Sequence, residues 1–189
     1  HNSGVVHAGL YYAPGSLKAR LCRRGGAMIT AFCEQHGLAY EECGKVVVAL
    51  NDGELGRLDD IENRARRNGV PGLRRLTAPQ LREVEPHVRG VAALYSPHTA
   101  VVDYAAVTHA LAGELHEAGG VVRLATAVTG LRQRGDEVVV ATTRGEQPVD
   151  RVIVCAGLQA DRVASLAGDD ADPRIVPFRG EYYLLAPHR

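Results

Sequence analysis

The chain has 189 residues, of which 46% are hydrophobic and 23% are charged, a composition typical of a globular protein and not of a disordered one. Its 22 basic and 22 acidic residues balance, so the net charge favours neither nucleic acid nor an anionic membrane surface as a partner. No run approaches the roughly 18 apolar residues that cross a bilayer, and the four cysteines lack the spacing of a zinc site, so neither a transmembrane segment nor a metal site is expected.

The first twelve residues, HNSGVVHAGLYY, combine two histidines and two tyrosines with glycines and other small residues. Small residues let a backbone approach a flat ligand closely, and histidine and tyrosine side chains exchange or donate protons. This stretch is therefore the first candidate for a functional site. An ordinary glycine-rich loop with two structural histidines is the alternative.

A helix is expected next, with Ser16 as its N-cap and Gly37 as its C-cap. Its apolar residues share one helical face: Leu17, Leu21, Met28 and Phe32. Gly25 and Gly26 weaken such a helix by about 1 kcal/mol each relative to alanine. They indicate either close approach of a backbone or ligand, or a tolerated weak point.

Residues 38–102 alternate short strands with helices. Strands are expected at 38–40, 45–50, 91–95 and 100–102, because these runs are apolar and bounded by turn residues. Helices are expected at 54–68 and, capped by Thr77, from Ala78 to a point before Pro86.

The remaining part predicts one helix and several strands. Asp103 is expected to cap a helix that Gly119 and Gly120 end. Strands are expected at 121–124, 127–131, 137–142 and 149–155, with a turn at 134–136. The whole pattern predicts a mixed α/β fold.

Four blocks resemble, in the same order, one known family. They are HNSGVVHAGLYYAPGSLKARLCRRG (1–25), SPHTAVVDY (96–104), VIVCAGLQADRVA (152–164) and VPFRGEYYLL (176–185). These blocks are similar to the L-2-hydroxyglutarate oxidase/dehydrogenase family, within the D-amino-acid-oxidase-like group of FAD-dependent oxidoreductases. The likeness covers almost the whole chain, and its first and last blocks are the specific ones. Ala100 stands where the family pattern has glycine.

The resemblance implies an FAD/NAD(P)-binding-like layer interleaved with a strand-rich substrate domain. Residues 1–37 and 103–168 would form the flavin-binding domain, and residues 38–102 and 169–189 the substrate domain, each of them partial. The family's G-x-G-x-x-G turn, which holds the ADP half of FAD, has no counterpart in this sequence. The chain is therefore expected to be an internal piece of a longer protein, with a flavin half that is destabilised or rearranged on its own.

The implied reaction is the FAD-dependent oxidation of an L-2-hydroxy acid, L-2-hydroxyglutarate to 2-oxoglutarate, by hydride transfer to the flavin. Oxygen or a quinone would accept the electrons. Glycerol 3-phosphate or an amino acid is the alternative substrate, and a non-catalytic fragment unable to retain FAD is the alternative outside enzymes. The location is expected to be cytoplasmic, or peripheral to the inner membrane.

Such a reaction needs a base for the hydroxyl proton and cations for the carboxylates. His7, in the first matched block, is the expected base; alternatively it only hydrogen-bonds a carbonyl or the flavin. Arg179 is expected to bind a carboxylate through two parallel hydrogen bonds, with an ion pair to Glu181 as the alternative. Tyr11 and Tyr12 are expected to donate hydroxyl hydrogen bonds to the substrate.

The residues expected to bind the cofactor lie in three places. Val128 corresponds to a position where related flavoproteins use backbone groups against the adenine. Small residues after a buried strand would allow close approach to the phosphate or ribityl region, although a tight strand exit explains the same sequence. The expected cofactor-binding residues are His1, Asn2, Ser3, Gly4, His7, Ala8, Gly9, Val128, Ala156 and Gly157.

Overall fold

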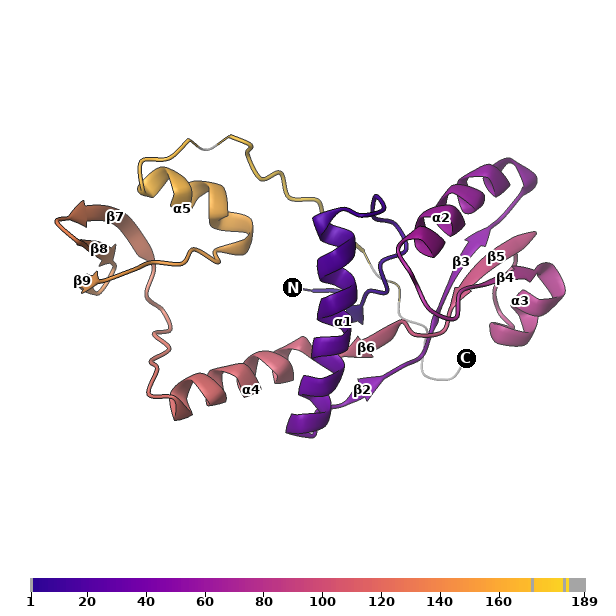
Figure 1. Cartoon of the computed structure of the whole chain (residues 1–189), viewed down its shortest axis with the longest axis horizontal. Coiled ribbons are helices and arrows are strands. Elements are labelled where there is room, and N and C mark those ends of the chain that lie inside the picture. Colours follow the sequence, from indigo (N-terminus) through magenta and orange to yellow (C-terminus); the bar gives the residue numbers. More distant parts are fainter. Residues whose placement is uncertain (1, 171, 182, 184–189) are drawn as a thin grey trace. The chain divides into compact units, whose positions relative to one another are not determined.

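The computed structural model describes residues 2–170, 172–181 and 183. The chain divides into two compact units, and the boundary in the sequence falls between Val121 and Val122 (Figure 1). The mixed α/β class is confirmed. The first unit contains β1 (Val5–Val6), α1 (Leu17–His36), β2 (Tyr40–Glu41), β3 (Lys45–Ala49), α2 (Leu55–Arg67), β4 (Arg74–Thr77), α3 (Ala78–Val84), β5 (Ala92–Ser96), β6 (Ala100–Val102) and α4 (Tyr104–Glu117). The second contains β7 (Val128–Arg134), β8 (Glu137–Thr142), β9 (Gly145–Val149) and α5 (Ala160–Leu166).

Helix α1 has the two caps that the sequence predicts. The Ser16 hydroxyl oxygen accepts a hydrogen bond from the Ala19 amide at 3.3 Å. Gly37 ends the helix in the left-handed conformation, with φ of 62°, and its amide donates back to the carbonyls of the last turn. The helix runs unbroken through Gly25 and Gly26.

A small antiparallel sheet packs against α1 and α4, with β6 between β1 and β2. Val6 lies opposite Ala100, and Tyr40 lies opposite Val102. The side chains buried between this sheet and the helices are Val6, Cys33, Ala100, Val102 and Val107. This packing fixes β1, and with it the first candidate stretch, against helix α1.

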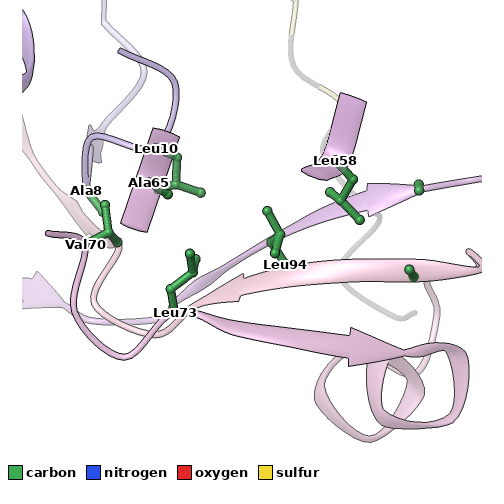
Figure 2. Close-up of a cluster of buried hydrophobic side chains, with 9 residues drawn as sticks. Ala8, Leu10, Leu58, Ala65, Val70, Leu73 and Leu94 are labelled. Carbon is green, nitrogen blue, oxygen red and sulfur yellow. The ribbon is translucent and has the colours of Figure 1, made fainter. Parts of the chain in front are cut away.

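The second sheet has the antiparallel order β3-β5-β4 and carries a helix on each face. Successive residues of a strand point to opposite faces. Leu94 accordingly packs with Leu58 of α2, whereas Ala93 packs with Leu81 of α3. Figure 2 shows the cluster on the α2 side, which also includes Ala8 and Leu10 from the candidate stretch.

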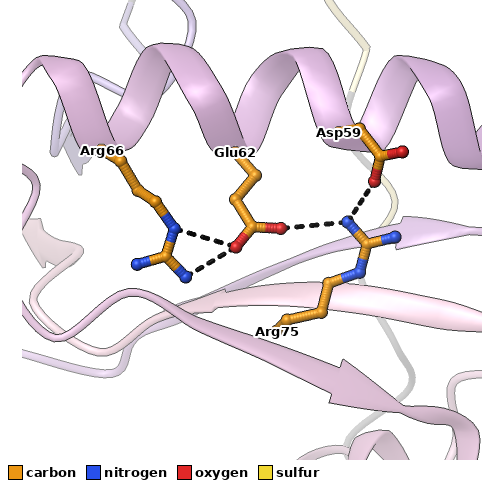
Figure 3. Close-up of polar contacts among 4 residues, drawn as sticks. All are labelled: Asp59, Glu62, Arg66 and Arg75. Atoms are coloured by element: carbon orange, nitrogen blue, oxygen red, sulfur yellow. Dashed lines mark hydrogen bonds and ion pairs between the residues drawn. The ribbon is translucent and has the colours of Figure 1, made fainter.

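An ion-pair network joins α2 to strand β4 (Figure 3). One guanidinium nitrogen of Arg75 lies 2.7 Å from an Asp59 oxygen and 3.1 Å from a Glu62 oxygen. The other Glu62 oxygen accepts from Arg66 at 2.6 Å. Glu62 is mostly shielded from solvent, so this network positions the helix more firmly than an isolated surface pair would.

The second unit consists of the antiparallel meander β7-β8-β9 and helix α5. Val139 of β8 is its buried centre. The expected turn at 134–136 joins β7 to β8, with Gly135 at φ of 62°.

Two expected strands do not form. Residues 121–124 have no regular structure, and Leu124 is 78% exposed. The strand expected at 149–155 is also wrong, because β9 ends at Val149 and Ile153 is 89% exposed. A strand needs a neighbour for its backbone N–H and C=O groups, and no strand within the described ranges pairs with either segment.

Candidate functional site

The stretch Asn2–Tyr12 is held in place by local hydrogen bonds and by strand pairing. The Asn2 side-chain oxygen accepts from the Gly4 amide at 2.8 Å, and the Ser3 hydroxyl oxygen accepts from the Val5 amide at 3.3 Å. Gly4 adopts φ of 68°, and its carbonyl accepts from Val102 at 2.8 Å. These side-chain oxygens of Asn2 and Ser3 therefore shape the turn into β1. His1, which is also predicted to bind the cofactor, lies outside the described residues.

The next residues form a buried segment, Ala8–Leu10, between two exposed side chains. Ala8 and Leu10 are buried in the cluster with Leu58 and Leu94 (Figure 2). His7 and Tyr11 are exposed. The buried Val6 and Ala8 on either side of His7 fix the backbone from which the imidazole projects. The imidazole is therefore presented at the surface by a rigid segment.

Asn68, which follows α2, ties the far end of this stretch to the helix. Its side-chain nitrogen donates to the Gly9 carbonyl at 3.1 Å and to the Tyr12 carbonyl at 2.9 Å. Gly9 has φ of 91°, a conformation that glycine adopts without strain. Asn68 therefore holds the turn between the buried Leu10 and the tyrosines.

A groove of about 600 Å³ opens between α1 and β1. One wall is a single face of α1, whose residues are alternately three positions and one position apart in the sequence: Lys18, Leu21, Cys22, Gly25, Gly26 and Ile29. A Cβ atom on Gly25 or Gly26 would meet nothing within 4 Å, so neither glycine packs against another backbone. The opposite wall includes His7, Tyr12 and Tyr104. The groove is thus largely apolar, with a few proton donors at its edges.

Helix α1 also holds the backbone of His7. The Cys22 thiol donates a hydrogen bond to the His7 carbonyl at 3.0 Å. Burial raises the pKa of Cys22 above its ordinary value, so this thiol stays protonated and remains a donor. Burial also raises the pKa of Tyr104, which therefore keeps its phenolic proton in the groove.

A second, much smaller hollow lies beside the groove. It holds about 20 Å³ and is lined by His7, Ala8, Gly9, Leu10, Tyr11, Tyr12, Lys45 and Thr99. His7 and Tyr12 line both spaces. The ammonium group of Lys45 lies over the Tyr11 ring, 4.6 Å from its centroid. The sequence predictions did not include Lys45.

The pKa of His7 is lowered from its ordinary value of 6.5, first by partial burial of the imidazole among its neighbours and then by the positive charge of Lys45. A histidine with a lowered pKa is neutral near pH 7 and has a nitrogen free to take a proton. The structure therefore brings together a neutral base, two tyrosines and a lysine around the small hollow, and two of these residues, His7 and Tyr12, also line the apolar groove.

The other predicted site residues lie in the second unit. Val128 begins β7, as expected for a strand after Thr126 and Ala127. Ala156 and Gly157 lead into a short 3-10 turn (Gly157–Gln159), and the strand expected before them is absent. Arg179 is 87% exposed, and its Nε lies 3.6 Å from a Glu181 carboxylate oxygen. This exposed pair leaves the guanidinium accessible.

Within the described ranges, no group of three or more histidine, cysteine or acidic side chains is arranged to hold a metal ion. The four cysteines are free thiols. No helix among the described residues is both long and apolar enough to cross a membrane.

Curated relatives are identical to this chain at about two fifths of the aligned positions. The chain is 41% identical over 201 residues to the mitochondrial L-2-hydroxyglutarate dehydrogenase of Homo sapiens, and 42% identical over 188 residues to the L-2-hydroxyglutarate dehydrogenase of Escherichia coli (strain K12). These alignments cover 100% and 99% of this chain but 43% and 44% of the relatives. The chain thus spans less than half the length of the curated relatives it matches.

Solved structures share the fold at lower identity. The FAD-bound L-alpha-glycerophosphate oxidase of Mycoplasma pneumoniae matches with a TM-score of 0.81 and 24% identity, over 88% of this chain and 46% of that one. The glycine oxidase of Geobacillus kaustophilus matches with a TM-score of 0.78 and 24% identity, over 88% and 47%. A family model described as FAD dependent oxidoreductase matches residues 1–189. The chain therefore belongs to the FAD dependent oxidoreductase family.

Proposed function

We propose that this chain forms part of an enzyme that oxidises L-2-hydroxyglutarate to 2-oxoglutarate with FAD as its cofactor. The observation that carries the proposal is the identity of 41% and 42% to two L-2-hydroxyglutarate dehydrogenases along essentially the whole chain. The solved glycerophosphate and glycine oxidases are less similar, at 24% identity each, and support the fold alone.

The groove along α1 fits a flavin ring. Isoalloxazine is flat and largely apolar, with polar atoms along its edges. The groove is lined by apolar side chains, by a few polar side chains, and by two glycines at which a Cβ atom would contact nothing. A flat ring can approach the helix at Gly25 and Gly26, where no Cβ atom intervenes. This arrangement accounts for two glycines that otherwise only weaken the helix.

His7 is the proposed base. When bound, FAD would accept the hydride that leaves C2 of the substrate. His7 takes the proton from the hydroxyl oxygen on C2, so that the carbon–oxygen double bond of the 2-oxo acid forms. Its lowered pKa keeps the imidazole unprotonated before the substrate arrives. Tyr11 and Tyr12, beside it, donate hydrogen bonds to the substrate.

The remaining site-residue and domain assignments are based on the family resemblance. Arg179 binds a substrate carboxylate, and Val128, Ala156 and Gly157 approach the cofactor, as do Asn2, Ser3, Gly4, Ala8 and Gly9. Residues 1–37 and 103–168 serve the flavin, and residues 38–102 and 169–189 serve the substrate. Oxygen or a quinone takes the electrons, and the enzyme works in the cytoplasm or on the inner membrane surface; the human relative is named mitochondrial.

The test is flavin bleaching under nitrogen in the complete protein. L-2-hydroxyglutarate should bleach the flavin and yield 2-oxoglutarate, whereas D-2-hydroxyglutarate, glycerol 3-phosphate and glutamate should not. Bleaching by glycerol 3-phosphate or by an amino acid in preference to L-2-hydroxyglutarate would overturn the substrate assignment.

The role of Arg179 is tested with a conservative change. Arg179→Lys should weaken the binding of L-2-hydroxyglutarate while the flavin absorption spectrum stays the same, because lysine lacks the two-pronged grip of a guanidinium. Arg174→Lys, on an exposed arginine five residues away, is the control and should leave binding unchanged. Equal affinity in the Arg179 variant and the wild type would remove Arg179 from the site.

A further inference from the structure

Lys45 is a half-buried cation without an acidic partner. It forms no ion pair with any residue that the structure describes, and its ammonium group rests over the Tyr11 ring. The strand pairing of β3, in which Lys45 lies opposite Ser96, holds its backbone. A partly shielded ammonium group without an acidic partner attracts anions more strongly than one fully exposed to solvent, so Lys45 is suited to bind an anion.

The hollow beside Lys45 has the size of one small group. A space of about 20 Å³ accommodates roughly one water-sized group, such as a single oxygen atom of a carboxylate. Its lining residues include His7, Tyr11, Tyr12 and Thr99, whose side chains carry an imidazole or a hydroxyl group. The hollow therefore combines a positive charge with hydrogen-bonding side chains and contains no acidic side chain among its lining residues.

The position of His7 indicates which end of a substrate the hollow receives. His7 lines both this hollow and the apolar groove, so an anion held by Lys45 lies next to the group that His7 deprotonates. In a 2-hydroxy acid the C1 carboxylate is bonded directly to C2, which carries the hydroxyl. The distal carboxylate of 2-hydroxyglutarate is separated from C2 by two further carbons.

We propose that Lys45 binds the C1 carboxylate of the 2-hydroxy acid in this hollow and so places the C2 hydroxyl against His7. The inference rests on the proposed function and extends it to a residue outside the first matched block.

The electrostatics support this arrangement. In the free site the charge of Lys45 helps to keep His7 unprotonated, as the lowered pKa of His7 indicates. A bound carboxylate offsets that charge and raises the affinity of His7 for a proton. The base thus gains proton affinity at the moment when the hydroxyl proton must leave.

The test uses the complete protein and two pairs of acids. L-2-hydroxyglutarate and L-2-hydroxybutyrate share the C1 carboxylate, but only the first has a distal one; 2-oxoglutarate and 2-oxobutyrate serve as the matching probes for calorimetric binding without turnover. Lys45→Met keeps an unbranched apolar side chain over the Tyr11 ring and removes the positive charge. It should weaken the binding of both probes and raise KM for both substrates by about tenfold to a hundredfold, the range of a charge-assisted hydrogen bond.

Charge restoration and a surface control complete the design. Lys45→Arg should recover most of the lost affinity, because it restores the positive charge. Arg24→Met removes an exposed cation of α1 that lines neither space and should leave both affinities unchanged. The flavin content and absorption spectrum should be the same in all variants.

Each contrary outcome has its own signature. A loss confined to the dicarboxylates would assign Lys45 to the distal end and overturn the C1 assignment, and unchanged affinities would remove Lys45 from the site. A changed flavin spectrum with normal binding would make Lys45 a cofactor residue. If instead the wild type neither binds nor oxidises these acids, the proposed function itself fails, independently of the Lys45 variants.

Discussion

The hydrogen bonds from Asn68 to the candidate stretch allow a direct test of how that stretch is held. Asn68→Ala removes both donations, to the Gly9 and Tyr12 carbonyls. A neutral hydrogen bond contributes about 1 kcal/mol, so the gross loss is about 2 kcal/mol. The Asn68 side-chain oxygen is buried and has no partner among the described residues, so its removal returns part of that loss. The expected net destabilisation is about 1–2 kcal/mol.

The assay is urea unfolding followed by circular dichroism, together with amide hydrogen exchange of residues 9–12. Asn68→Ala should unfold at lower urea and exchange faster in this segment. Asn68→Asp should lose more than the alanine variant, because it removes both donors and places a negative charge against two carbonyl oxygens. Asn63→Ala, at an exposed position of the same helix, is the control and should change stability by less than about 0.5 kcal/mol. Equal effects of Asn68→Ala and Asn63→Ala would refute the anchoring role.

Two further predictions concern charge. Glu62→Gln weakens the ion pairs with Arg75 and Arg66. It should lower the free energy of unfolding in urea by about 0.5–1 kcal/mol at low salt, and this loss should fall toward zero in about 1 M salt. A loss that does not change with salt would contradict the electrostatic explanation. Because the pKa of His7 is lower in the folded chain than in the unfolded chain, the unfolded chain binds this proton first as pH falls below 6.5. The free energy of unfolding therefore decreases as pH falls from 6.5 to the folded-state pKa, and the loss persists at lower pH. His7→Gln should therefore flatten the decline of stability between pH 7 and pH 5, and an identical decline in both proteins would show that His7 is not responsible.

Local signals predicted the helices well. Ser16, Gly37 and Asp103 all cap helices as the sequence indicates, since a cap depends on hydrogen bonds within a few residues. The strands at 121–124 and 149–155 failed because apolar, β-branched composition indicates only that a segment is suited to a sheet. Whether it becomes a strand depends on a pairing partner elsewhere in the chain, which composition does not specify.

The candidate site was also predictable only where its residues are close together in sequence. The matched block identified His7, Tyr11 and Tyr12, which lie close together because they are neighbours in sequence. Lys45 and Asn68 reach the site from a strand and a helix end that are far along the chain. Their only sequence signals were a charge at the start of an apolar run and an asparagine before a helix-ending glycine, and both have ordinary structural explanations.

The burial of Ala8 and Leu10 on either side of Gly9 has a consequence for anyone who would transplant this motif. The dozen residues cannot be moved to another scaffold as a loop. Ala8 and Leu10 pack against the apolar side chains of α2 and β5 (Figure 2), and Val5 and Val6 pair with β6. A graft that kept the histidine and the tyrosines but omitted Leu58 and Leu94 would carry the right chemical groups in the wrong geometry. The smallest portable unit is the motif together with the elements that hold it, which are β6 and α1 at its start and α2 and β5 at its centre.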